Sequence, residues 1–474
     1  MKVHNGWILI VFVFFFGRID AHYHNKTAYA PRQPAGTDEI GFASWHTITD
    51  APDYHSKNHT LHTHISGTPF YEQSHETTLT GGYFSPNAEG NSVVVDAYNN
   101  TPLFVNTLFI HNADHPDDAD MADIITFEPK RHAYGVRFDF QQRLFHRWDR
   151  LFLTISTAFA SLTHDLDVTL KNASLMHGFS SKDFFAGLVH IPQGNNAQLP
   201  LTKAKMAHNI TKMGFTDFAV QLKYVIARHK NHQLMGAAGI LIPTGTTARG
   251  TWLWEPITGN GGHTGLTGNL LADMQLWRNV EKKASVSFRS MLAYQYLFKA
   301  YETRTLSLRD DWFPADVKAG WNFYYLGKTI GQTVGIPAAN IFTKPLSVRP
   351  GSQGQALDAG YYALYKDQES VALRVYQQPE FILVTRDNDM SSENKSLKTG
   401  LSAATSDISL RDFDLTKSTN PSYMTHRLFA SWAYTFLSAH AYPTLLGCGI
   451  SYETTATNAV APVVTAWLKS SISF

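Results

Sequence analysis

Charged side chains alternate with apolar ones along several segments of the chain, and their placement suggests a shared chemistry. Arg137, Asp139 and Arg143 fall on one side of a period-two pattern, and Asp217 and Lys223 do so in a later segment. Arginines and lysines gathered around a water-filled passage attract anions. The same charges could instead pair with one another and pack a closed interior. Basic residues outnumber acidic ones among the candidate pore-lining residues, which are Arg137, Asp139, Arg143, Asp217, Lys223, Asp273, Arg289, Lys299, Arg374 and Arg427.

Histidines raise two further possibilities, a metal site and a catalytic site. His55, His59, His62 and His64 lie close together, but no Cys or carboxylate completes a tetrahedral set around them, so we expect polar filler. The His164-Asp165 pair could serve a hydrolase. However, the chain has neither a Gly-x-Ser-x-Gly elbow nor a His-Glu-x-x-His motif. We therefore expect no enzymatic activity, no metal and no cofactor.

These residues are positioned by long segments in which apolar and polar residues alternate. The pattern predicts strands at 131–144, 151–160, 216–226, 284–300, 369–378 and 425–436. A strand needs about 9 to 11 residues to cross a bilayer at a tilt, whereas strands of soluble sheets average roughly five or six. The length of the segments favours a transmembrane antiparallel up-and-down β-barrel, in which one face meets lipid and the other a polar lumen.

The connections between these strands alternate in size, as an asymmetric barrel requires. Tight turns are predicted at Phe145–Arg150, Arg228–His232, Arg278–Lys283, Lys366–Glu369 and Phe436–Ala441, and long loops lie between them. An even strand count needs one more strand before residue 131, which we place within 92–112. The expected barrel therefore has about twelve strands, within a range of about 10 to 14. Ser181 to Leu188 could form a short loop helix, which either folds over the barrel mouth or belongs to a plain solvent loop.

The C-terminal segment, 459–474, shows the same alternation. Val464, Ala466, Leu468, Ile472 and Phe474 fall on one face, and Lys469, Ser471 and Ser473 fall on the other. A closing strand with a terminal aromatic resembles the C-terminal signature of bacterial outer-membrane barrels. The resemblance implies a location in the bacterial outer membrane, contact with its lipid, and recognition of Phe474 by the barrel-insertion machinery.

A second resemblance rests on Gly239 to Gly245 (Gly-Ile-Leu-Ile-Pro-Thr-Gly), the glycine-rich loop after it, and the strand from Leu270 to Trp277. This order is similar to outer-membrane channels of the long-chain fatty-acid transporter family and of the phenol-degradation-associated (MetA-pathway) barrel family. It implies passage of hydrophobic or aromatic compounds. The fatty-acid family also carries an N-terminal hatch with an Asn-Pro-Ala-Gly-type motif. In this chain the segment from Ser85 to Gly90 reads Ser-Pro-Asn-Ala-Glu-Gly, so Pro precedes Asn.

The composition agrees with an exported barrel. The chain has 474 residues, of which 17% are charged and 13% aromatic, against roughly 25% charged in soluble domains. Its net charge of +1 gives no general attraction to nucleic acid, and its single cysteine excludes an internal disulfide. Residues 1–21 read as a signal peptide. We expect an N-terminal arm or plug at 22–90 and the transmembrane β-barrel at 91–474.

The function expected from these features is an outer-membrane channel for passive uptake of small solutes. The resemblance favours hydrophobic or aromatic solutes, and the basic residues favour acidic ones. A non-conducting surface or adhesion barrel and an outer-membrane hydrolase are the alternatives.

Overall fold

A computed structural model gives the structure of the protein. It describes residues 26–27, 63–75, 83, 92–96, 103–104, 122–126, 128–145, 148–170, 181–190, 197–229, 232–279, 284–309, 321–324, 326–329, 334–350, 352–358, 362–367, 395–398, 405–407, 410–420, 423–436, 444–457 and 462–474. The predicted signal peptide, the segment from Ser85 to Gly90, and the predicted strand at 369–378 with Arg374 lie outside these residues.

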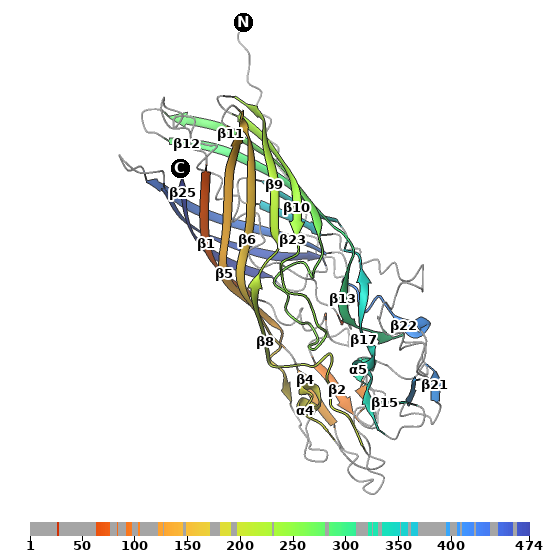
Figure 1. The fold of residues 1–474 in the computed structure, drawn as a ribbon. Coiled ribbons are helices and arrows are strands. Elements are labelled where there is room, and N and C mark those ends of the chain that lie inside the picture. The colour runs from red at the N-terminus through yellow and green to blue at the C-terminus, as the bar shows by residue number, and fades with distance from the viewer. Residues whose placement is uncertain are drawn as a thin grey trace.

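One antiparallel sheet closes on itself to form a barrel (Figure 1). Each strand pairs with its sequence neighbour in the wall, and β1 pairs with β25, so the first and last strands meet. The sheet has thirteen labelled strands, but β8 and β9 pair with successive parts of β6 and share one place. The described residues therefore give a ring of twelve, as predicted. The wall strands are β1 (Thr63–Ser74), β5 (Lys130–Phe145), β6 (Trp148–Asp165), β8 (Asn209–Phe215), β9 (Phe218–Arg228), β10 (His232–Ile242), β11 (Gly265–Asn279), β12 (Ala284–Leu297), β18 (Ser352–Asp358), β19 (Tyr362–Asp367), β23 (Tyr423–Phe436), β24 (Thr444–Thr457) and β25 (Val463–Ser473).

The first wall strand is a correction to the sequence prediction. β1 lies within the segment expected to be an arm, so the barrel begins at Thr63 rather than at residue 91. The segment at 92–112 contributes β2 (Ser92–Asp96) and β3 (Leu103–Phe104) to a separate small sheet with β4 (Ala122–Thr126) and β7 (Thr169–Leu170). Apolar content misled the prediction here, because β1 carries few large apolar residues and Ser92–Asp96 carries three valines.

Short connections gather at the barrel end that holds Phe474, and long ones gather at the other end (Figure 1). Four of the five predicted tight turns are confirmed, between β5 and β6, β9 and β10, β11 and β12, and β23 and β24. The turn predicted at Lys366–Glu369 is wrong, since Lys366 lies within β19 and pairs with Gly354 and Met424. The fifth turn instead joins Asp358 to Tyr362.

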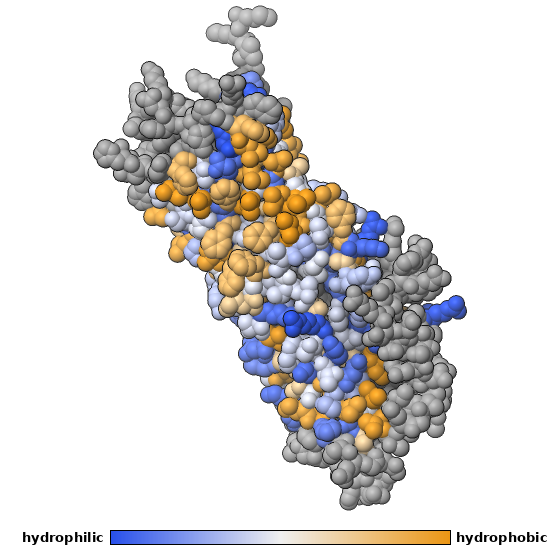
Figure 2. Space-filling model, viewed as in Figure 1, coloured by the Kyte–Doolittle hydropathy of each residue, from blue (hydrophilic) through white to orange (hydrophobic). Residues whose placement is uncertain are grey.

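The two faces of the wall differ as the alternation predicted. In β25 the side chain of Leu468 is 62% exposed, whereas that of the adjacent Lys469 is 3% exposed. Large apolar residues of other strands also point outward, among them Ile65, Tyr71, Leu222, Tyr224, Ile226 and Ile472. On the face shown in Figure 2, apolar side chains form a broad area over the barrel. The exposed surface of the barrel is thus apolar.

Beyond the end with the long connections, a packed cap extends from the barrel (Figure 1). Phe184 and Phe185 of α4 (Ser181–Ala186) pack edge-on against Tyr324 of the 3-10 helix η5 (Asn322–Tyr324). The predicted alternative of a short loop helix is thereby confirmed. Burial raises the pKa of Tyr324, whose hydroxyl donates to the carbonyl of Ala204 at 2.7 Å.

The cap also contains several short elements. They are β13 (Ala300–Thr305), β14 (Ser307–Leu308), β15 (Leu326–Thr329), β16 (Ile336–Pro337), α5 (Ala338–Phe342), β17 (Thr343–Val348), β20 (Lys395–Lys398), β21 (Thr405–Asp407), η8 (Leu410–Asp412) and β22 (Phe413–Asp414). A search of the described residues finds no helix with the length and hydropathy to span a membrane.

Candidate functional site: the inner face of the barrel

A group of basic side chains is buried on the inner face of the wall. Arg137 and Arg143 of β5, Lys223 of β9 and Lys469 of β25 are between 1% and 9% exposed, and we call them the basic cluster. The ring of His64 on β1 is within electrostatic range of Lys223, Lys469 and Asp139, so strands from separate parts of the wall contribute to one cluster. Sequence alternation places Lys469 on the polar face, although Lys469 is not among the predicted pore-lining residues.

The Asp139 carboxylate lies beside the basic cluster. Arg137 donates to Asp139 through Nε at 3.0 Å, and its NH2 nitrogen lies 2.9 Å from the same carboxylate oxygen. Ser66 of β1 also donates to Asp139, at 3.4 Å. The Asp139 carboxylate is therefore engaged by its own strand neighbour Arg137.

The remaining predicted pore-lining residues are on other parts of the wall and its rim. Asp217 sits at the junction of β8 and β9, and its carboxylate accepts backbone N–H groups of Gly245 at 2.9 Å and Asn260 at 2.8 Å. Lys299 follows the end of β12 and is exposed. Asp273 and Arg289 are opposite one another in the β11–β12 ladder. Arg427 of β23 is opposite Ala363 and Glu453.

A second buried ion pair lies toward the cap end of the wall. The NH1 nitrogen of Arg131 donates to Glu72 at 2.9 Å, and both side chains are at most 5% exposed. The sequence prediction missed this pair because Glu72 lies in the segment expected to be an arm. The alternation of Ile65, Pro69 and Tyr71 with polar residues was the available signal.

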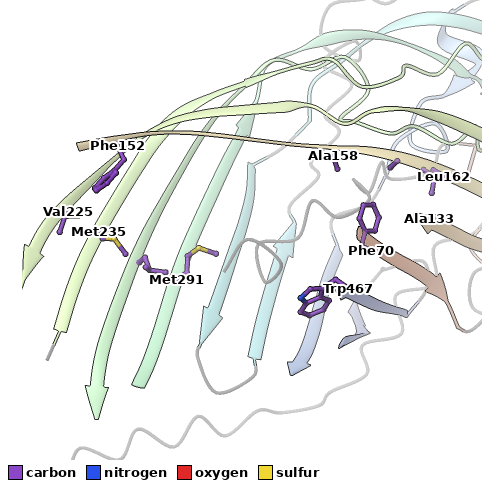
Figure 3. Packing of buried hydrophobic residues seen from close by; sticks show 11 residues of the cluster. Phe70, Ala133, Phe152, Ala158, Leu162, Val225, Met235, Met291 and Trp467 are labelled. Atoms are coloured by element: carbon purple, nitrogen blue, oxygen red, sulfur yellow. The ribbon is translucent and has the colours of Figure 1, made fainter. Parts of the chain in front are cut away.

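An apolar row runs around the inner wall beside the basic cluster. Val225, Met235, Leu271 and Met291 are direct cross-strand partners on β9, β10, β11 and β12. All four are at most 3% exposed and belong to one buried cluster (Figure 3). Alternation alone could not find this row, because apolar residues on the inner face break the simple pattern of polar residues inside.

Phe152 of β6 joins the apolar row to the basic cluster. It is opposite Lys223 in one ladder and opposite Arg143 in the other. The guanidinium of Arg143 lies 5.8 Å from the centre of the Phe152 ring, within the range of a cation–π contact. The inner wall thus presents cationic and apolar groups side by side.

A glycine-rich segment closes against the barrel rim where the resemblance to channel families was noted. A Cβ on Gly245 would lie 2.4 Å from the Cα of Gly259, so the two backbones can approach only as glycines. The same segment holds Asp217 through Gly245 and Asn260. The glycines therefore have a packing role at the rim.

Three buried ionisable side chains, the triad of His263, Glu302 and Arg304, connect segments of the chain at this rim. The ring of His263 contacts the carbonyl oxygen of Phe298 at 2.7 Å and the Glu302 carboxylate at 2.6 Å, and Arg304 donates to Glu302 at 3.0 Å. Arg304 also donates to the carbonyl of Ser418 at 2.8 Å. Burial alone would raise the pKa of Glu302, but Arg304 and His263 outweigh it and lower that pKa to about 2.

The histidines considered for catalysis or metal binding contact groups other than a catalytic or metal-binding partner. His164 Nδ1 is within 2.8 Å of the backbone carbonyl of Trp254, whereas the Asp165 carboxylate accepts the N–H of Asp167. His64 lies on the inner wall, where Nδ1 is 3.0 Å from the hydroxyl of Ser473. Across the described residues, no three His, Cys, Asp or Glu side chains converge as metal ligands would.

Comparison with known proteins gives likenesses among solved structures only. No protein-family model and no curated protein sequence matches the chain. The COG4313 outer membrane channel from Pseudomonas putida F1 is 11% identical, over 90% of this chain and 99% of that one, with a TM-score of 0.32. The transport unit of the autotransporter AIDA-I from Escherichia coli is 8% identical, over 94% and 100%, with a TM-score of 0.31. A Pseudomonas aeruginosa FadL homologue is 6% identical, over 87% and 89%, with a TM-score of 0.25. Because these scores are low, the fold rests on the strand pairings themselves.

Proposed function

We propose that the chain is a channel of the bacterial outer membrane through which small solutes pass passively. The closed ring of strands with an apolar outer face and a polar inner face carries this proposal. A closed barrel leaves no unpaired strand edge, which a hydrocarbon layer would not tolerate. Most wall strands have at least eleven residues, enough to cross a bilayer of ordinary thickness at a tilt of about 45°.

The solutes we propose are small hydrophobic, aromatic or acidic compounds. The apolar row of Val225, Met235, Leu271 and Met291 supports the first two, and the basic cluster supports the third. Transport needs no nucleophile or general base. Accordingly, the mechanism we envisage is diffusion along the inner wall, with the cap elements at its outer entrance.

The near-complete burial of the inward charged side chains favours a second candidate, a surface or adhesion barrel that does not conduct. Lys223 is 1% exposed and Lys469 is 3% exposed, so water barely reaches them in this conformation. A channel must therefore widen its lumen by moving these side chains, whereas an adhesion barrel would keep them packed.

Recording from planar bilayers separates the two candidates. Purified protein should give steady conductance steps if it is a channel, and a silent membrane containing folded protein would support the surface barrel. Two substitutions on β10 provide a matched pair. Ala237 is opposite Lys223 on the inner face, whereas the next residue, Ala238, is exposed. Ala237→Trp should reduce the step size, and Ala238→Trp should leave it unchanged.

A further inference from the structure

The apolar outer surface of the barrel ends at a definite row of residues on β6 and β8. Met213 and Phe215 of β8 are 57% and 46% exposed, and Phe215 packs edge-on against Phe159 of β6 with ring centres 5.2 Å apart. Beyond Met213 toward the cap, the hydroxyls of Thr211 and Thr163 are hydrogen-bonded at 2.8 Å. Membrane barrels place aromatic residues where hydrocarbon meets the lipid headgroups. We therefore expect the hydrocarbon layer to end at this row.

The segment that follows β10 is fixed on the cap side of this row. Lys212, the residue before Met213, donates to the backbone carbonyl of Thr247 at 3.1 Å and forms an ion pair with Glu255. The Glu255 carboxylate also accepts the backbone N–H of Arg249 at 2.8 Å. The backbone of Arg249 is therefore held beside the strand that carries the edge of the apolar surface.

Three basic side chains lie together on this segment and its neighbour, and we call Lys203, Lys205 and Arg249 the rim patch. Lys203 Nζ donates to the backbone carbonyl of Arg249 at 3.0 Å, and Lys205 Nζ lies 4.6 Å from the centre of the Trp252 ring. The Arg249 side chain is exposed, and the two lysines are partly exposed. Among the ion pairs of the described residues, none involves the rim patch, and Glu255 pairs with Lys212.

The backbone holds the rim patch in place. The N–H groups of Lys203 and Lys205 donate to the Asn340 side chain at 3.1 Å and to the carbonyl of Thr251 at 2.9 Å. The three charges are thus presented together at the surface. On the face shown in Figure 2, strongly hydrophilic side chains lie on the cap side of the apolar area.

A lipid with an anionic head has the two chemistries that meet here. Its head accepts charge-assisted hydrogen bonds from lysine and arginine, and its acyl chains cover the apolar surface beside them. A phosphate group offers several oxygens, which suits cations that approach from separate points of the chain. A free anion in solution would match the charges but would leave their position at the edge of the apolar surface without a use.

We infer that the rim patch binds the phosphorylated headgroup of a lipid in the outer leaflet of the membrane. The phosphate lies among Lys203, Lys205 and Arg249, and the acyl chains lie against Met213 and Phe215. This inference rests on the outer-membrane location of the barrel, and it requires no conduction through the lumen.

Native mass spectrometry of the full chain in detergent micelles tests the inference, because it counts the lipids that stay bound. Lipid A and its dephosphorylated form are the probes. Lipid A should bind at least about fivefold more tightly, since each basic residue at a membrane surface contributes roughly this factor. Equal binding of the two forms would overturn the inference. Inorganic phosphate that binds as tightly as lipid A would also overturn it, because the patch would then be a site for free phosphate.

Substitutions locate the site. Arg249→Gln and Lys203→Gln should each weaken lipid A binding by about fivefold, whereas Arg249→Lys keeps the charge and should retain most of the affinity. Arg411→Gln is the matched control, because Arg411 is an exposed arginine of η8 in the cap. Lipid A binding that neither rim-patch variant weakens, or that Arg411→Gln weakens equally, contradicts the assignment.

Lipid binding and conductance are measured separately, so the two proposals can fail separately. Preferential binding of lipid A by a protein that is silent in planar bilayers keeps the lipid site and removes the channel. Conductance steps from a protein that does not distinguish the two lipid forms keep the channel and remove the lipid site.

Discussion

The two ring nitrogens of His263 connect two groups at the rim. Its Nδ1 faces the carbonyl oxygen of Phe298 and its Nε2 faces the carboxylate of Glu302, and both partners can only accept. Each ring nitrogen of His263 therefore faces an acceptor. Glu302 is then shared between His263 and Arg304, and Arg304 carries the contact on to Ser418. Through Glu302 and Arg304, the segments that hold His263 and Ser418 are connected.

We predict that Glu302→Gln loosens the rim. The substitution leaves the buried Arg304 guanidinium without its counter-charge, and removing one partner of a buried ion pair costs about 3–5 kcal/mol. Amide hydrogen exchange should accelerate in the peptides that contain Phe298 and Ser418, while the exchange of β1 and β25 should stay slow. Tyr301→Phe, at an exposed neighbouring position, is the control. Unchanged exchange near Ser418 in the Gln variant would show that the triad does not hold the rim.

The lowered pKa of Glu302 predicts a dependence of rim stability on pH. Its ordinary value of 4.5 falls to about 2 in the folded protein, so the ionised carboxylate stabilises the rim above about pH 4.5. That stabilisation is lost as the pH falls from about 4.5 toward 2. Hydrogen exchange near Ser418, corrected for its intrinsic pH dependence, should rise across this interval in the wild type. The Glu302→Gln variant should lack this titration, and a titration of equal size there would assign it to another group.

At the scale of the strand, one glycine of β24 has a packing requirement that a second glycine lacks. Gly449 is opposite Trp467 of β25, and a Cβ at Gly449 would lie 2.2 Å from the indole ring. A Cβ on Gly67 of β1 would meet nothing within 4 Å. We predict that Gly449→Ala destabilises the barrel by about 1–3 kcal/mol, because the buried indole must move. Gly67→Ala should be neutral or slightly stabilising.

Guanidinium unfolding of the two variants in lipid vesicles measures this difference, with tryptophan emission as the signal. Gly449→Ala should also shift that emission, because Trp467 is 3% exposed in the native wall. A Gly449 variant as stable as the Gly67 variant would mean that the indole adopts another rotamer without cost.

Strands with strong alternation could be predicted closely, and weakly patterned ones could not. β12 was expected at 284–300 and spans Ala284–Leu297, since six apolar residues at alternate positions mark one of its faces. β1 was missed because it carries few large apolar residues, although both of its edges pair in the wall. The turn at Asp358–Tyr362 was predicted too late in the chain, at Lys366–Glu369. Apolar and polar residues alternate through the short strands on both sides of the turn, so the pattern does not mark its position. The positions of these elements follow from pairing with neighbouring strands, which the local sequence pattern does not specify.

At the scale of the whole molecule, the alternation predicted the closed wall, but not the way in which the lumen is filled. Arg137, Arg143 and Lys223 were expected to face the interior, and the structure buries all three. Their assembly with Lys469 and His64 follows from strand register, which the sequence does not specify. The apolar row likewise depends on register, because Met235, Leu271 and Met291 become neighbours only when β10, β11 and β12 pair in this alignment.

The apolar outer face provides the last prediction, which concerns the membrane itself. Leu468 is 62% exposed on β25, midway along a strand whose inner residues are buried. If lipid covers this face, Leu468→Arg should destabilise the inserted barrel by about 2–4 kcal/mol near the midplane of the bilayer, whereas Leu468→Phe should be tolerated. The fraction of protein folded in vesicles across a guanidinium titration measures the effect. The same Arg substitution should have little effect in detergent micelles that solvate the arginine, because the penalty arises from hydrocarbon rather than from protein packing. A penalty of equal size in micelles and vesicles would instead place Leu468 against protein, and the outer face would then be an interface between chains.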